Sequence, residues 1–154
     1  MSTGVLEESS GREFWWDAAS ALVALVGLAD STYLTVEHVT GASVRCMIVS
    51  GCDEVLQSRY ATVAGGFPVA ALGALAYFAV FSLATLSAYG YAGARRLLAP
   101  LVAVMFLATL WFFYLQALVL HAFCAYCLLS AAVTTALTLL VLARRLFGPK
   151  KRLS

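Results

Sequence analysis

The sequence predicts an all-α membrane protein built as a four-helix bundle, and two observations on composition and pattern support this. Of the 154 residues, 62% are hydrophobic and 12% are charged, whereas soluble domains have roughly 45–50% apolar and about 25% charged residues. Residues 60–94, 97–120 and 122–143 contain no Asp, Glu, Lys, Arg or His. Each run is long enough to cross a bilayer core as a helix, which takes roughly 20 apolar residues. The length fits one domain.

A fourth apolar run, from Trp15 to Val39, contains a few charged residues and precedes these three. A signal peptide is the alternative for this run, but its basic flank is only Arg12 and no small-residue cleavage site follows cleanly. Pro68 and Pro100 stand near expected helix starts, where a missing N–H costs little. The predicted helices cover residues 15–37, 68–90, 97–119 and 123–145.

The distribution of basic residues predicts the orientation in the membrane. Arg95 and Arg96 lie in the link between the second and third helices, and a basic cluster follows the fourth helix. Apart from Arg45 and Arg59, every Lys and Arg then falls on one side, which the positive-inside rule assigns to the cytoplasm. We expect both termini there, with a long extracytoplasmic loop between the first two helices. The expected segments are a disordered cytoplasmic N-terminus (1–14), the transmembrane domain (15–146) and a basic cytoplasmic tail (147–154).

This topology brings all four cysteines to the extracytoplasmic boundary. Cys46 and Cys52 lie in the long loop, and Cys124 and Cys127 open the fourth helix. Disulfides persist on that side of a membrane. The chain offers no independent basic fold for nucleic acid, because its basic residues stand beside hydrophobic runs.

Cys124 and Cys127 form a Cys-x-x-Cys motif at a helix start. Residues three apart share a helix face, and the N–H groups of a first turn stabilise a thiolate. A thiolate attacks disulfides and donates electrons to acceptors such as a quinone. A structural disulfide is the alternative. A zinc site is less suited, because structural zinc sites usually pair two short knuckles on a small soluble fold.

The pair Cys46 and Cys52 encloses five residues of the loop. Ser50 is a candidate cap for a short surface helix in which Cys52 occupies the first turn. A structural disulfide that only stabilises the loop is the alternative. A loop dithiol beside a second dithiol is better suited to relaying electrons.

The combined pattern resembles the vitamin K epoxide reductase family in its bacterial form, over about residues 15–145. The matching residues are Cys46 and Cys52, Ser58-Arg59-Tyr60, Gly66-Phe67-Pro68, Cys124-Ala125-Tyr126-Cys127, and Ser31-Thr32-Tyr33-Leu34 with His38.

The resemblance implies catalytic roles for the four cysteines. Cys46 and Cys52 would exchange with a partner protein, Cys124 would accept electrons from Cys52, and Cys127 would pass them to a quinone near Ser58. It further implies a bacterial inner membrane, ubiquinone or menaquinone as bound substrate, and no metal. Many bacterial relatives carry a fused thioredoxin-like domain; here we expect a separate thioredoxin-fold, DsbA-like partner.

Two positions depart from the animal members of that family. Ala131 stands where they carry a Tyr, and Val69 where they carry an Asn; both are quinone hydrogen-bonding positions in that branch. The resemblance therefore favours a thiol:quinone oxidoreductase that supports disulfide formation. Reduction of a quinone or its epoxide in the vitamin K cycle is the first alternative, and a non-enzymatic membrane metal-binding protein is the second.

Three further residues within the spans are candidates for the site. Gln116 is a candidate donor to a quinone carbonyl, or else bonds a neighbouring helix. Phe112, one turn deeper on the same face, is a candidate to line the pocket of the quinone ring, and ordinary packing is its alternative. Asp30 lies roughly 22 Å along the first helix. Ionisable residues at such depth are costly and usually functional. Two interpretations of Asp30 are equally supported: it belongs to a proton route, or it is an acid held by hydrogen bonds inside the bundle.

Overall fold

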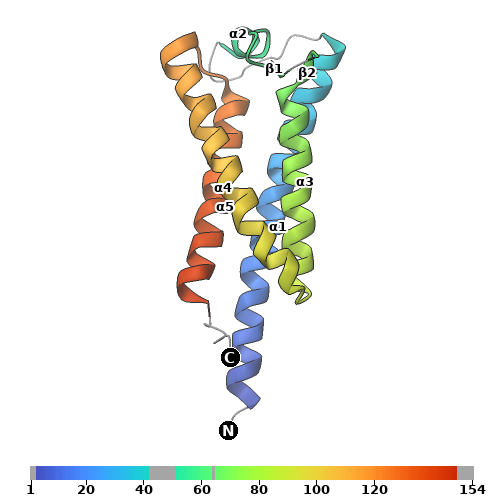
Figure 1. Cartoon of the computed structure of the whole chain (residues 1–154), viewed down its shortest axis with the longest axis vertical. Coiled ribbons are helices and arrows are strands. Elements are labelled where there is room, and N and C mark those ends of the chain that lie inside the picture. The colour runs from blue at the N-terminus through green and yellow to red at the C-terminus, as the bar shows by residue number, and fades with distance from the viewer. Residues whose placement is uncertain (1–2, 42–50, 64, 149–154) are drawn as a thin grey trace.

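The computed structural model describes residues 3–41, 51–63 and 65–148 and confirms the all-α membrane fold. Four helices are long and apolar enough to span a bilayer: α1 (Thr3–Thr40), α3 (Val69–Ala88), α4 (Ala92–Tyr114) with its continuation η1 (Leu115–Leu120), and α5 (Ala125–Phe147). Figure 1 shows them as a bundle with both chain ends at one end, here called the termini end.

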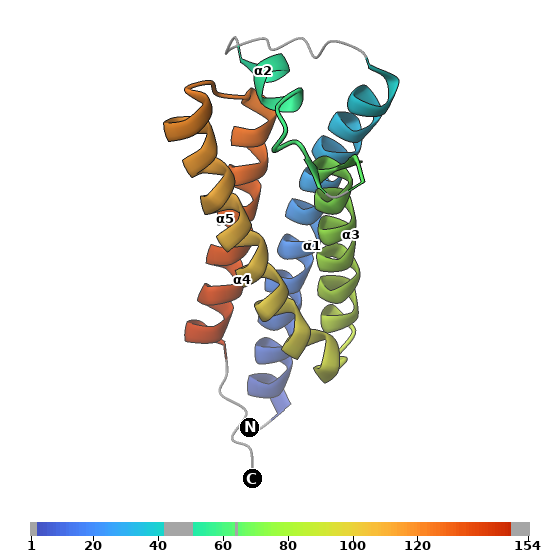
Figure 2. The ribbon, with the colours of Figure 1, turned by 45° about the horizontal axis from the view of Figure 1, so that its top comes forward.

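The opposite end, here called the loop end, carries the short elements between the first two spans. The helix α2 (Cys52–Leu56) lies across it, followed by an antiparallel pair of strands, β1 (Thr62–Val63) and β2 (Phe67–Pro68). Figure 2 shows α2 over the end of the bundle, above the start of α5. The short helix predicted between the first two spans is therefore present.

Two helices begin earlier than hydropathy predicted. Helix α1 begins at Thr3 and covers most of residues 1–14, where we expected disorder. No proline interrupts that segment, so the helix continues beyond the apolar part of the chain. Helix α4 begins at Ala92, directly after a turn in which Gly90 has a φ of 92°. Pro100 consequently lies inside α4, and the prediction that it stands near the helix start is wrong.

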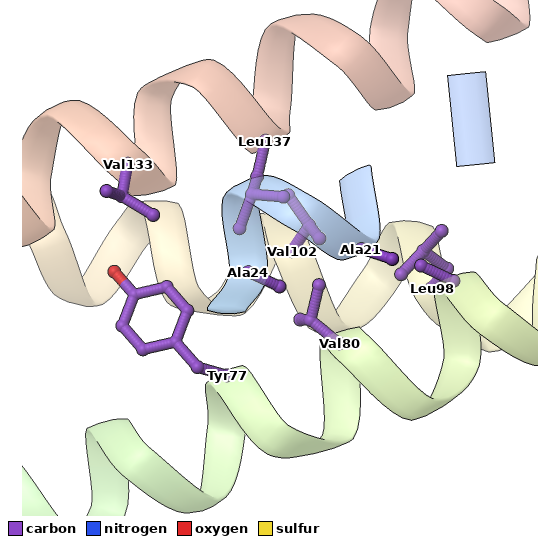
Figure 3. Packing of buried hydrophobic residues seen from close by; sticks show 9 residues of the cluster. Ala21, Ala24, Tyr77, Val80, Leu98, Val102, Val133 and Leu137 are labelled. Carbon is purple, nitrogen blue, oxygen red and sulfur yellow. The ribbon is translucent and has the colours of Figure 1, made fainter. Parts of the chain in front are cut away.

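Close packing around Tyr77 joins three of the spans. A methyl group on Gly27 of α1 would lie 2.4 Å from Cε1 of Tyr77 on α3, so only glycine permits this approach. The Tyr77 hydroxyl is within 2.8 Å of the hydroxyls of Ser130 and Thr134 on α5. Figure 3 shows Tyr77 among the buried side chains of α1, α3, α4 and α5. This cluster packs the four spans against one another.

A buried ionic network ties three spans together at the termini end. Arg144 of α5 pairs with Asp17 of α1, whose side chain is 1% exposed. The Ser87 hydroxyl on α3 donates to Oδ2 of Asp17 at 2.9 Å and accepts from Nη1 of Arg144 at 3.0 Å. Asp17 is one of the few charged residues in the first apolar run, and nothing in the sequence pattern predicted this network.

Candidate active site

The Cys-x-x-Cys motif stands at the start of α5, as predicted. Cys124 is the N-cap residue and is fully buried, and Cys127 lies in the first turn and is partly buried. Both are free thiols. His121, three residues before Cys124, has a φ of 50°, a left-handed conformation that ends η1 and turns the chain toward α5. The two sulfurs therefore share one turn, close enough for a hydrogen bond.

The Cys124 sulfur accepts hydrogen bonds that favour its thiolate. The Cys127 thiol donates to it, and the backbone N–H groups of Cys127 and Tyr126 also point to it. The Cys127 hydrogen bond is the largest cause, and it lowers the pKa of Cys124 to about 7, against the opposing effect of burial. A thiolate forms near neutral pH at Cys124, which suits this sulfur for attack on a disulfide.

Titration of the Cys124 thiolate tests this arrangement. We expect its ultraviolet absorbance to rise with pH with a midpoint of about 7, because the thiol is protonated below that value and ionised above it. Cys127→Ala removes the donor and should raise the midpoint, whereas Cys127→Ser retains a hydroxyl donor and should raise it less. An unchanged midpoint in Cys127→Ala would contradict the assigned hydrogen bond.

Gln116 holds the turn that positions Cys124. Its side-chain Oε1 accepts the backbone N–H of Cys124 at 3.0 Å, and its backbone oxygen accepts the N–H of Ala122 at 3.2 Å. Gln116 is 3% exposed and lies in the π-helix η1, a distortion frequent at functional sites. The side-chain oxygen of Gln116 therefore bonds the N-cap residue of α5, in line with the alternative that Gln116 bonds a neighbouring helix.

Removing this acceptor should loosen the start of α5. Gln116→Met keeps the side-chain length but leaves the buried Cys124 N–H without a partner, which costs about 1–3 kcal/mol in the free energy of unfolding. Equilibrium unfolding in detergent measures the loss. Gln57→Met, at an exposed position after α2, is the matched control and should change stability little. Equal losses in the two variants would refute the positioning role.

Helix α2 brings Cys52 to the same end of the bundle. Its N-cap residue is Gly51, not Ser50 as predicted, and Ser50 lies outside the described residues. A methyl group on Gly51 would lie 2.8 Å from the backbone oxygen of Phe123, so α2 sits directly against the chain before α5.

Cys52 occupies the first turn of α2, as expected, and belongs with Cys124 and Leu34 to one buried cluster. It is disulfide-bonded and 2% exposed. Cys46 lies outside the described residues. Cys52 and Cys124 are thus packed in one cluster where α2 meets the start of α5.

A cavity of about 440 Å³ lies below α2, between the spans. Its wall includes Cys127 together with all three residues predicted to contact a quinone, Ser58, Phe112 and Gln116. The Ser58 hydroxyl donates to the backbone oxygen of Val55 at 2.7 Å, so its proton is engaged and its oxygen is left as an acceptor at the cavity wall. Most of the remaining wall is aliphatic or aromatic, which fits a flat apolar ring with polar groups at its edge.

Other residues of the cavity wall matter for the chemistry. Ala131 and Val69 line it, so the two departures from the animal pattern stand at the cavity itself. Asp30, named from the sequence without a settled role, lines it as well. The candidates named from the sequence did not include Tyr77, which also lines the cavity. The available signal was a tyrosine hydroxyl deep within an uncharged apolar run.

Comparison with known families identifies the kind of protein to which this site belongs. The family model described as vitamin K epoxide reductase family matches residues 18–142. The chain belongs to the vitamin K epoxide reductase family. The match contains the second and third spans and most of the first and fourth, and it includes the residues of the cavity wall, Cys124 and Cys127.

Membership gives the general activity of the chain. Proteins of the vitamin K epoxide reductase family are membrane oxidoreductases that act on a quinone or its epoxide, and the quinone is a substrate. The apolar cavity beside Cys127 has the character that such a substrate requires. Among the described residues, no group of three or more His, Cys, Asp or Glu side chains is arranged to hold a metal ion.

Proposed function

We propose that this member of the vitamin K epoxide reductase family is a thiol:quinone oxidoreductase that supports disulfide formation. The observation that carries the proposal is the division of the Cys-x-x-Cys pair between two environments. Cys124 is buried in the cluster with Cys52 and is not part of the cavity wall, whereas Cys127, which packs against the same cluster, also lines the apolar cavity. One sulfur is thus available to the loop and the other to the quinone.

The electron path follows this division. A reduced thioredoxin-fold, DsbA-like partner attacks the loop disulfide formed by Cys46 and Cys52 and leaves oxidised. Cys52 then attacks the Cys124–Cys127 disulfide at Cys124, and Cys46 resolves the mixed disulfide, so the pair at α5 becomes the dithiol. That dithiol is oxidised back to the disulfide as two electrons and two protons convert the quinone to the quinol.

The charge distribution supports the orientation that this path needs. Five arginines belong to helix segments at the termini end: Arg12 in the first part of α1, Arg95 and Arg96 at the start of α4, and Arg144 and Arg145 at the end of α5. Among the described residues, the one Lys or Arg at the loop end is Arg59, between α2 and β1. By the positive-inside rule, the termini end is cytoplasmic. The cysteines are then on the extracytoplasmic face, as expected for a bacterial inner membrane, where disulfides persist.

The cavity wall favours quinone reduction over reduction of the epoxide. Ala131 and Val69 offer no side-chain hydrogen bond at the positions where animal members carry Tyr and Asn. Ser58 and Gln116 are the polar groups that we assign to the quinone edge, with Phe112 against the ring. Ubiquinone and menaquinone both fit this description.

The order of the relay is tested with two reductants. Purified protein in detergent receives ubiquinone or menaquinone and either a reduced thioredoxin-fold protein or dithiothreitol, and quinone absorbance is followed. Cys46→Ala should lose turnover with the protein reductant and retain it with dithiothreitol, which can reduce the α5 pair directly. Retention with the protein reductant would overturn the shuttle role of the loop pair.

A further inference from the structure

Asp30 stands at the cavity, and its carboxyl group has no hydrogen-bond partner in the part of the chain that the structure describes. The residue lies in α1, is 7% exposed and lines the cavity together with Cys127. Neither Oδ1 nor Oδ2 has a hydrogen-bond partner among the described residues. Buried polar groups in native proteins are nearly always paired, so an unpaired carboxyl facing a substrate cavity calls for a role involving the occupant.

The surroundings favour the neutral form of this carboxyl. None of the described cavity residues is Lys or Arg, and an isolated carboxylate within a membrane span is costly. The titratable groups that share the cavity are His38 on α1, Tyr60 after α2, Tyr77 on α3 and Cys127 on α5, with Cys124 at the start of α5. The Tyr77 hydroxyl already bonds to α5. A neutral Asp30 has a free O–H that can donate.

The proton balance of the proposed reaction leaves a place for such a donor. With Cys124 as thiolate and Cys127 as thiol, the pair carries one proton, whereas the quinol needs two. Oxidation of the pair forms the Cys124–Cys127 disulfide and passes two electrons and the Cys127 proton to the quinone. One further proton must reach the second quinone oxygen from another group at the cavity.

We propose that Asp30 is that group, the proton donor to the quinone at this cavity. The carboxylic acid gives its proton to the reduced quinone oxygen and becomes the carboxylate, which regains a proton from water before the next turnover. Atoms and charge balance, because a thiolate is consumed as a carboxylate forms. This inference rests on the proposed quinone reduction. It gives a role to Asp30, which takes no part in the cysteine relay.

The test compares Asp30→Asn with the unaltered protein. The amide has the same shape but no acidic proton. General acids contribute typically 10²–10⁴-fold, so kcat for ubiquinone with dithiothreitol should fall by about a hundredfold or more, with KM little changed. Asp30→Glu should restore part of the rate. Glu37→Gln, on the same helix but not in the cavity wall, is the control and should retain it.

A thiol measurement separates proton donation from a structural role. Reduction of the Cys124–Cys127 disulfide by dithiothreitol, followed by thiol alkylation and mass spectrometry, needs no proton from Asp30 to a quinone and should be unchanged in Asp30→Asn. If this variant reduces quinone at the native rate, or loses both reactions in proportion, the proposal is wrong. Absence of quinone reduction in the unaltered protein would instead refute the proposed function, and this inference with it.

Discussion

Cys127→Ala should abolish quinone reduction. We expect turnover to fall by at least about a thousandfold, as is typical when a residue that takes part in covalent catalysis is removed. Cys127 is the motif sulfur that lines the cavity, and without it Cys124 cannot form the internal disulfide that gives up two electrons. Turnover is followed by quinone absorbance with dithiothreitol as reductant, so that the loop cysteines are not required.

A second substitution shows whether the loss reflects chemistry or packing. Cys127→Ser retains size and a hydrogen-bond donor to Cys124 but cannot form a disulfide, so it should be as inactive as Cys127→Ala. Both variants should retain the native melting temperature in detergent within a few degrees, as about 1 kcal/mol corresponds to 2–4 °C at this chain size. Robust turnover by either variant would refute the assigned electron path.

Asp17→Ala should produce the largest loss of stability. The substitution leaves the Arg144 guanidinium, whose side chain is 11% exposed, without its carboxylate, and removes the acceptor of the Ser87 hydroxyl. Breaking a buried pair in this way costs about 3–5 kcal/mol. Equilibrium unfolding in detergent micelles measures the change.

The chain provides a matched control in a second ion pair at the same end. Glu13 pairs with Arg95 at 3.3 Å, with side chains 21% and 35% exposed. Glu13→Ala should cost about 0–1 kcal/mol, as exposed pairs do. A double substitution of Asp17 and Arg144 by leucine and methionine should recover much of the loss, because no unpaired charge remains. Equal losses for Asp17→Ala and Glu13→Ala would show that burial does not govern this network.

The membrane architecture was predictable because hydropathy and charge act over whole segments. Three uncharged runs and one interrupted run were enough to predict four spans, and Pro68 does stand at the N-cap of α3. The starts of α1 and α4 were not predictable in this way, since a helix continues past the apolar boundary until backbone geometry stops it. Gly90, with its positive φ, sets that point for α4.

The candidate site was predictable where residue chemistry repeats at short spacing and not where it depends on packing. The Cys-x-x-Cys motif stands at a helix start, as its position in the sequence indicated. Ser58, named through the family resemblance, and Phe112 and Gln116, named from their positions in the third span, all line the cavity, and their contact with a quinone stays a prediction. The Gln116 contact to Cys124 depends on the π-helical turn, which no sequence periodicity signals. The pairing of Asp17 with Arg144 joins opposite ends of the chain and needs the assembled bundle.

The most direct test of the electron path is a single turnover with no reductant present. The protein is reduced with dithiothreitol, freed of it, mixed with ubiquinone, and sampled for quinol and for the alkylation state of each cysteine. We predict that quinol appears as the Cys124 and Cys127 thiols are lost to a disulfide between them, and that Cys46→Ala gives the same result. Quinol formed while both thiols stay reduced, or no quinol at all, would contradict the account.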